Sequence, residues 1–195
     1  GEYNFLLQYL RGIKAPIIFD IGAHIGDYSI AALKANKNSD IHCFEPSQSH
    51  LNELKANLRD YDIKINPYGL SNYEKKERLF KDKEISGLKS LVKRDLSHLS
   101  IQNEEFEIVN LRVGDNYIKL NKLDKINLIK IDVEGWEMEV LNGFTESLKD
   151  KKVDIFQFEF GHAHIEKRQN FRDFYKFFST YDYVLGALKP NGKIN

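Results

Sequence analysis

The chain has 195 residues, enough for one domain of ordinary size and too few for two. Hydrophobic residues make up 42% and charged residues 30%, a composition that excludes a globally disordered chain. Lysine plus arginine and aspartate plus glutamate number 29 each, so the net charge is zero, and the broad positive surface of a nucleic-acid-binding protein is not expected.

The first predicted unit is a strand followed by a helix. Residues 15–21 (APIIFDI) form a short β-branched and aromatic run that ends at Gly22, which is typical of a buried strand. Residues 28–37 have the pattern of a helix, and we expect Asp27 to cap it. The unit then repeats, since residues 41–45 (IHCFE) predict a second strand.

A second helix is predicted to begin at Pro46 and Ser47. Its apolar positions fall on one face: Leu51, Leu54 and Leu58. Residues 64–68 predict a third strand. The alternation of strands and helices indicates an α/β fold, a doubly wound and mostly parallel sheet with flanking helices.

The second half of the chain continues this alternation. Residues 128–133 (LIKIDV) and 153–160 (VDIFQFEF) predict two strands, with a helix at about 137–148 between them. A final strand is expected around 183–188. Before it, four aromatic residues at helical spacing predict a core-facing helix rather than a ligand cage: Phe171, Phe174, Phe177 and Phe178.

The regular alternation of predicted strands and helices is interrupted between residues 74 and 127. Residues 106–113 predict an extra strand without a well-formed helix beside it. We therefore expect one domain over residues 1–195, with an insertion at about 74–127 over one end of the sheet.

The cysteine count and the apolar runs bear on the expected compartment. Cys43 is the single cysteine, so neither an internal disulfide nor a cysteine-based zinc site is expected. No apolar run reaches the roughly 20 residues of a transmembrane helix, and no signal peptide pattern is present. We expect a cytoplasmic protein without a membrane span, and the start at Gly1 rather than Met suggests a trimmed chain.

A glycine-rich turn, FDIGAHIGD, follows the first predicted strand. Glycines at such a turn let a ligand approach the backbone closely. The spacing is GxxxG from Gly22 to Gly26, with Asp20 two residues earlier, whereas a dinucleotide fingerprint has GxGxxG. The second strand ends in Glu45, whose carboxylate can accept both hydroxyl protons of a ribose. The pair indicates a nucleoside-containing ligand; the structural alternative is that Asp20 caps the turn and Glu45 is a solvated strand end.

Polar residues interrupt the two strands of the second half. Strands buried on both faces are nearly all apolar, yet alternation places Lys130 and Asp132 on one face, and Gln157 and Glu159 on one face of the next strand. If the faces coincide, these groups cluster at the carboxyl ends, where open α/β sheets bind ligands. The structural alternative is an ion pair between Lys130 and Glu159.

These segments resemble a known family in order and spacing. FDIGAHIGDYS, CFEPSQSHLNELKANL, NPYGLSN, ISGLKSL and LIKIDVEGWEMEVLNGF followed by FEFGHAH are similar to the FkbM family of S-adenosylmethionine-dependent methyltransferases. The resemblance implies a class I methyltransferase fold of Rossmann-like type. It spans most of the chain, and the KIDVEG block is its most specific part.

The resemblance implies roles for individual residues. It places the methionine part of S-adenosylmethionine over a turn made of Asp20, Gly22, Ala23, His24 and Gly26. Glu45 matches the ribose-binding carboxylate, and Leu70 and Ser71 match the segment beside the adenine. Asp132 matches the position that faces the methyl group and the acceptor.

The chain departs from the family pattern at two positions and at its end. Family members often have Asn where this chain has His24, and a small residue where it has Trp136. The second difference is expected to reshape the acceptor pocket. Class I enzymes usually finish with an antiparallel hairpin, whereas here the chain ends at Asn195.

Methylation of a hydroxyl needs a base that removes the proton. Asp132 and His162 are the first candidates because each follows a strand at the expected ligand edge, and Glu134 and His164 come next. Glu134 has a structural alternative, since it can complement the positive end of the following helix. A divalent metal ion held by Asp132 and Glu159 is a further hypothesis, and an ion pair with Lys130 is preferred to it.

The sequence thus predicts an S-adenosylmethionine-dependent methyltransferase, acting on a hydroxyl of a sugar or of another small hydroxylated metabolite. The acceptor class rests on the family resemblance. One alternative is an NAD-dependent oxidoreductase, which Glu45 supports and the missing GxGxxG weakens. Another is a non-catalytic binding module that keeps the cofactor fold.

Overall fold

A computed structural model of the chain describes residues 1–81, 89–91, 105–161, 164, 167 and 169–195. Its centre is a five-stranded parallel sheet with the strand order β3-β2-β1-β8-β9. In that order the strands are Ile63–Asn66, Asp40–Phe44, Ile17–Ile21, Ile126–Ile131 and Val153–Phe158. The predicted doubly wound, mostly parallel α/β sheet is confirmed, and the five predicted strands that form it lie within a few residues of their expected bounds.

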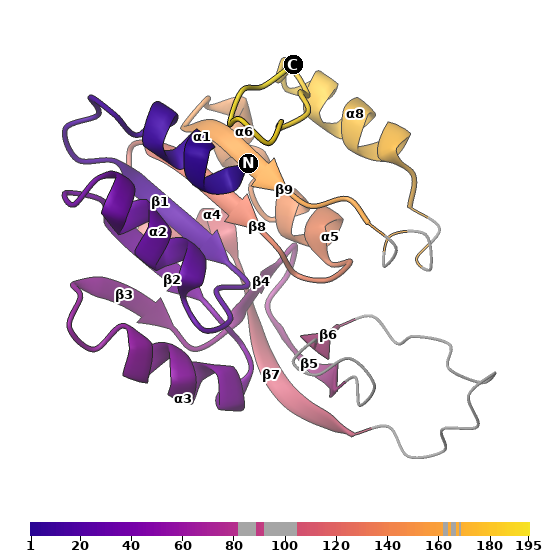
Figure 1. Ribbon diagram of the computed structural model, residues 1–195. Coiled ribbons are helices and arrows are strands. Elements are labelled where there is room, and N and C mark those ends of the chain that lie inside the picture. Colours follow the sequence, from indigo (N-terminus) through magenta and orange to yellow (C-terminus); the bar gives the residue numbers. More distant parts are fainter. Residues whose placement is uncertain (82–88, 92–104, 162–163, 165–166, 168) are drawn as a thin grey trace.

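Helices cover both faces of this sheet (Figure 1). One face carries α1 (Glu2–Tyr9), α2 (Asp27–Ala35) and α3 (Gln48–Asn57). The other carries α4 (Gly114–Leu120), α5 (Glu137–Asn142), α6 (Thr145–Lys149) and α8 (Phe171–Thr180). Because helices cover both faces, residues 18–21 of β1 are all buried, and all of them except Asp20 are apolar, as is typical of a parallel strand. The apolar face of α3 is as predicted, with Leu51, Leu54 and Leu58 buried.

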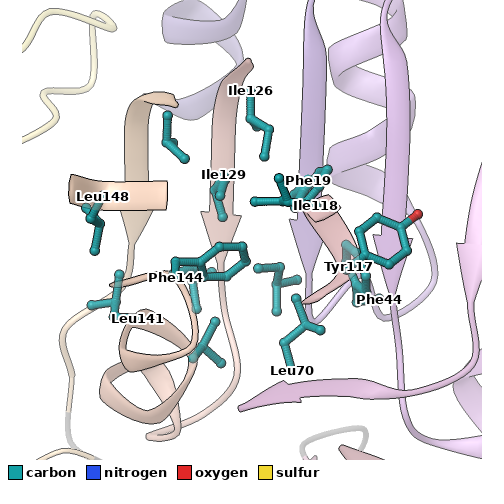
Figure 2. Close-up of a cluster of buried hydrophobic side chains, with 14 of the residues drawn as sticks. Phe19, Phe44, Leu70, Tyr117, Ile118, Ile126, Ile129, Leu141, Phe144 and Leu148 are labelled. Atoms are coloured by element: carbon teal, nitrogen blue, oxygen red, sulfur yellow. The ribbon is translucent and has the colours of Figure 1, made fainter. Parts of the chain in front are cut away.

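Among the described residues, the largest of the three hydrophobic clusters lies between the sheet and α4, α5, α6 and α8. Figure 2 shows the side chains of Phe19, Phe44 and Phe144 meeting those of the helices. The ring centroids of Phe19 and Phe44 are 5.3 Å apart. Phe174 and Phe178 of α8 are buried in the same core, as predicted. Phe171 is 52% exposed, so the prediction that all four aromatics face the core was wrong for this residue.

A second sheet lies beside the first and has the order β4-β7-β5-β6. Its strands are Gly69–Ser71, Phe106–Val113, Lys75–Lys81 and Lys89–Ser90, in that order. The extra strand expected at 106–113 is confirmed, but α4 follows it directly, so the expectation of no well-formed helix beside it was wrong. The single domain and the insertion at about 74–127 stay predictions.

Three local expectations were wrong for identifiable reasons. Gly26, with φ +95°, is the N-cap of α2, and Asp27 is already helical. The helix expected at 137–148 is two helices, α5 and α6, separated at Gly143, where a β-carbon would lie 2.3 Å from the carbonyl oxygen of Ser71. No strand forms around 183–188, because the chain there turns back on its own last residues, with a single bridge between Leu188 and Ile194.

The last residues pack on the first helix. Asn4 and Gln8 of α1 donate side-chain hydrogen bonds to the carbonyl oxygens of Pro190 and Asn191, so the two ends of the chain lie together (Figure 1). Within the part of the chain that the structure describes, no helix is long and apolar enough to cross a bilayer.

Candidate active site

A cavity of about 520 Å³ opens where β1, β2 and β8 end. Its wall includes the first turn after β1, the end of β2, the turn after β8, and residues of α1, α2 and α3. The carboxyl edge of a parallel sheet is where open α/β folds bind ligands, and the volume is in the range of small-molecule sites.

The turn after β1 is shaped by two glycines. Gly22 has φ +80°, and a β-carbon on it would lie 1.9 Å from the carbonyl oxygen of Asp132. The amides of Gly22 and Ala23 both donate to the carbonyl oxygen of Phe44, at 2.9 and 3.2 Å. Gly26 has φ +95°, and a β-carbon there would meet Leu54 at 2.9 Å. The turn therefore packs tightly, at Gly22 against the backbone of Asp132 and at Gly26 against the side chain of Leu54, and Gly22 lines the cavity.

Glu45 follows β2 and is held in one orientation. Its side chain lines the cavity although the residue is only 4% exposed. One carboxylate oxygen accepts the amide N–H of His24 at 2.9 Å, and the other accepts that of Ser47 at 2.8 Å. Each oxygen keeps a further acceptor direction. The alternative in which Glu45 is a solvated strand end was wrong.

Two histidines stand beside Glu45. The rings of His24 and His50 meet edge to face, with centroids 4.2 Å apart, and His50 Nδ1 lies 3.6 Å from a Glu45 oxygen. Burial, and then the nearby His50, lower the pKa of His24. Because its pKa lies below the ordinary value of 6.5, the imidazole of His24 is neutral at pH 7. The backbone of His24 has φ +51°, a conformation that non-glycine residues seldom adopt.

Asp20 lies beneath the cavity rather than in its wall. It is fully buried and accepts a hydrogen bond of 2.7 Å from the Ser29 hydroxyl, and its other oxygen is 3.7 Å from Lys130 Nζ. Burial raises the pKa of Asp20, although Lys130 and Ser29 oppose the rise. Asp20 therefore connects β1 to α2 and to the lysine of β8.

Lys130 forms ion pairs with two carboxylates at once. Its Nζ is 3.1 Å from Asp132 and 3.7 Å from Asp20. Burial alone would lower the pKa of Lys130, but the two carboxylates outweigh it and the pKa lies above the ordinary value. The predicted alternative, a pair with Glu159, was wrong, because Glu159 is exposed. Gln157, the register partner of Lys130 on β9, accepts a hydrogen bond of 2.9 Å from the Tyr28 hydroxyl.

The turn after β8 carries two acidic residues into the cavity wall, Asp132 and Glu134. Glu134 has φ +53° and Gly135 has φ +95°, so two consecutive residues are left-handed. Glu137, the first residue of α5, accepts the Val133 amide N–H at 3.1 Å. The two predicted roles of Glu134, a candidate base and a partner of the positive end of α5, stay predictions.

Trp136 closes the side of the cavity next to the second sheet. Its Nε1–H donates to the Ser71 hydroxyl at 3.2 Å, and Lys167 Nζ lies 3.7 Å from a ring centroid. Leu70 lines the cavity near it. Both residues that depart from the family pattern, His24 and Trp136, thus form part of the site.

The structure brings most of the predicted site residues together. The cavity wall contains Gly22, Ala23, His24, Glu45, Leu70, Asp132 and Glu134. Three predicted cofactor residues are outside the wall: Asp20, Gly26 and Ser71. His162 lies outside the described residues. Among the described residues, no group of three or more His, Cys, Asp or Glu side chains could hold a metal ion.

Several residues of the wall were not predicted from the sequence. They include Glu2, Tyr3, Tyr28, His50, Leu79 and Leu91. His50 had a detectable signal, since it precedes Leu54 by one helical turn and so shares its face of α3. Glu2 and Tyr3 belong to α1, a helix that was not predicted.

Comparisons with known proteins show which family and which relatives this chain is similar to. The family model of the methyltransferase FkbM domain matches residues 20–185. Hexuronic acid methyltransferase AglP of Haloferax volcanii is 28% identical over 83% of this chain and 64% of its own length. AMB antimetabolite synthetase AmbE of Pseudomonas aeruginosa is 27% identical over 74% of this chain and 8% of its own length.

This chain is also similar to another methyltransferase and to a solved methyltransferase structure. Methyltransferase 1 of Beauveria bassiana is 23% identical over 66% of this chain and 58% of its own length. The chain thus spans less than two thirds of each of these relatives. A crystal structure of precorrin-6y C5,15-methyltransferase from Geobacter metallireducens superposes with a TM-score of 0.51 and 13% identity, over 93% of this chain and 71% of that one, which supports the fold assignment.

Proposed function

The chain belongs to the FkbM methyltransferase family, and on this premise we propose that it transfers a methyl group from S-adenosylmethionine to a hydroxyl of a sugar or of another small hydroxylated metabolite. The observation that carries the proposal is the orientation of Glu45 in the cavity wall. Two backbone amides hold its carboxylate, and one acceptor direction remains on each oxygen. A pair of adjacent ribose hydroxyls matches this arrangement.

The remaining wall fits the other parts of S-adenosylmethionine. The backbone of Gly22 and Ala23 offers a surface with almost no side chain for the methionine part. Pro46, Gly69 and Leu70 form an apolar wall on the side of β2 and β4, which suits a purine ring. These residues would hold the cofactor, with Glu45 on its ribose.

The charge of the wall favours a cationic ligand over a pyrophosphate. Among the described residues of the wall, the carboxylates belong to Glu2, Asp27, Glu45, Asp132 and Glu134, and the one lysine is Lys130. A sulfonium ion is attracted to such a site. A pyrophosphate binds at a helix N-terminus, but the first residue of α2 is Asp27, which would repel it. This observation weakens the NAD-dependent alternative.

S-adenosylmethionine, when bound, supplies a methyl group whose bond to sulfur breaks as the bond to the acceptor oxygen forms. We assign Asp132 as the base that accepts the hydroxyl proton; its place in the cavity wall and its 39% exposed side chain at the end of β8 support this role. Lys130, 3.1 Å away, orients that carboxylate. Glu134 is the second candidate base. The walls from α1 and α2 would hold the acceptor in line, which contributes to the rate by orientation.

The acceptor class is proposed from two sources. The relative from Haloferax volcanii is named a hexuronic acid methyltransferase, and the family resemblance implies a hydroxylated acceptor. We therefore propose a small-molecule or glycan acceptor. A divalent metal is not part of the proposal, because Lys130 already pairs with Asp132.

A methyl-transfer assay tests the proposal. The chain is incubated with S-adenosylmethionine labelled in the methyl group and a panel of free and conjugated hexoses and hexuronic acids. Label in a sugar, with release of S-adenosylhomocysteine, supports the proposal. Binding of S-adenosylmethionine with no transfer to any hydroxylated acceptor would favour the non-catalytic module.

A further inference from the structure

A buried pair of ionisable residues stands directly behind the cavity wall. Glu137 of α5 is 1% exposed and His164 is 2% exposed. Nε2 of His164 lies 2.7 Å from a carboxylate oxygen of Glu137. Neither residue lines the cavity. A buried charge is costly unless it is paired, so each residue holds the other in place.

The second carboxylate oxygen of Glu137 reaches the turn after β8. It accepts the Val133 amide N–H at 3.1 Å. Val133 lies between Asp132 and Glu134, which both line the cavity. Since Glu134 is a non-glycine residue with φ +53°, the turn holds a conformation that persists only when its surroundings maintain it. The bond from Glu137 is one such constraint.

The imidazole of His164 is itself held on several sides. Phe160 stacks on it with a centroid distance of 4.8 Å, and Phe174 of α8 meets it edge-on at 5.4 Å. Nδ1 lies 3.1 Å from the amide nitrogen of Gly161 and 3.3 Å from its carbonyl oxygen. The pair therefore connects the end of β9 and the helix α8 to the turn that carries Asp132.

We propose that Glu137 and His164 are a positioning pair. Glu137 holds the amide of Val133, the residue between Asp132 and Glu134, and so fixes the direction of those two side chains. The proposal rests on the proposed function, because it assigns the pair a role at that same site. Neither residue touches the cavity, so their effect passes through the turn. The carbonyl of Asp132 also packs on Gly22, so the pair influences both the expected base and the expected cofactor turn.

The pair gives this effect a pH dependence. Burial lowers the pKa of His164, but the hydrogen bond and charge of Glu137 outweigh burial and the pKa lies above its ordinary value of 6.5. Among the described residues, the charged groups that act on the imidazole are Glu137 of α5 and Lys167, whose charge acts in the opposite direction. The ion pair is therefore complete below the raised pKa and is lost as the pH rises through it.

Trp136 provides a direct readout. It is the single tryptophan of the chain and the residue before α5, next to Glu137. Its fluorescence is titrated from pH 5 to pH 9 in the wild type and in His164→Gln. We expect a transition with a midpoint above 6.5 in the wild type, and no such transition in His164→Gln. The same transition in both proteins would contradict the proposal.

Affinity for S-adenosylhomocysteine gives the second readout. Glu137→Gln and His164→Gln should weaken it about tenfold, since a displacement of about 1 Å at a site is enough for large effects. Asp115→Asn is the matched control: Asp115 is buried and accepts the amides of Glu146 and Ser147 at 2.8 and 3.0 Å, but it does not line the cavity. It should lower the melting temperature while affinity changes by less than about twofold.

The outcomes separate the pair from the proposed function. The pair would have only a structural role if Glu137→Gln lowered the melting temperature as much as Asp115→Asn does and both variants kept the wild-type affinity for S-adenosylhomocysteine. If the folded wild type does not bind S-adenosylhomocysteine, the proposed function fails, and the Trp136 titration still decides whether the pair controls the turn. If Glu137→Gln does not fold, both measurements are made on His164→Gln, which keeps the hydrogen bond that Glu137 accepts from the Val133 amide.

Discussion

Gly22 and Asp132 touch through their backbones: a β-carbon on Gly22 would lie 1.9 Å from the carbonyl oxygen of Asp132. This contact joins the glycine turn after β1 to the turn after β8. The two motifs are far apart in the sequence, yet they form one wall of the cavity.

Gly22→Ala should destabilise the protein by about 2–5 kcal/mol, from the left-handed backbone and the overlap with Asp132 together. Gly12 is a matched control, because its φ is +90° and nothing lies within 4 Å of its β-carbon position. Gly12→Ala should cost only about 1–2 kcal/mol, the backbone part alone. Urea unfolding at pH 7 measures both, and equal losses would show that the contact with Asp132 has no energetic weight.

Lys130→Met should destabilise the protein by about 3–5 kcal/mol at pH 7, because it leaves the buried Asp20 without its cation. The pKa of Asp20 is already raised by burial. A raised carboxyl pKa means that folding is favoured as the pH falls and Asp20 takes up a proton. The difference in the free energy of unfolding between the wild type and Lys130→Met should therefore become smaller as the pH falls from 7 to 5.

The control for this change is Lys64→Met, at the exposed pair with Asp40. It should alter stability by less than about 1 kcal/mol. A Lys130→Met variant whose deficit is constant with pH would contradict the assignment of Asp20 as the charge that Lys130 stabilises.

Phe174→Ala should cost about 3–5 kcal/mol, because Phe174 is fully buried between α8 and the sheet. Phe171→Ala, one turn earlier on the same helix and 52% exposed, should cost about 1 kcal/mol or less. Thermal unfolding of the two variants compares them directly. Similar losses would mean that the outer face of α8 is covered in solution.

Asp132→Asn should lower turnover by about 10²–10⁴-fold if Asp132 accepts the acceptor's proton. Affinity for S-adenosylhomocysteine should stay close to that of the wild type, since the change is isosteric. Asp124→Asn, at an exposed position before β8, is the control and should leave both unchanged. Full activity of Asp132→Asn would transfer the role to Glu134 or to a residue beyond those described.

The strands of the main sheet could be predicted because each is a short apolar run with its own local pattern. The polar residues at their ends were equally visible, which is why Glu45 and Asp132 could be assigned to one edge before the structure was known. The ion-pair partners of the polar side chains could not be predicted from the sequence. Whether Lys130 pairs with Glu159 or with Asp20 depends on strand order, since β1 and not only β9 lies beside β8.

Other parts of the site depend on contacts that no local pattern encodes. Helix α1 brings Glu2 and Tyr3 to the cavity only because the sheet lies beneath it. The expected final strand failed because residues 187–195 pair with each other rather than with β9. Glu137 had the pattern of an ordinary helix residue, and its bonds to Val133 and His164 appear only when the turn is folded.

Calorimetric titration with S-adenosylmethionine and S-adenosylhomocysteine, with NAD as the comparison ligand, tests the central claim most directly. We expect the wild type to bind the first two and not NAD. Glu45→Gln should weaken both by about tenfold or more, because a charged acceptor of two ribose hydroxyls is lost. Glu146→Gln, at an exposed ion pair with Lys119, should bind as the wild type does. No binding by the folded wild type, binding that survives Glu45→Gln, or binding of NAD instead would contradict the account.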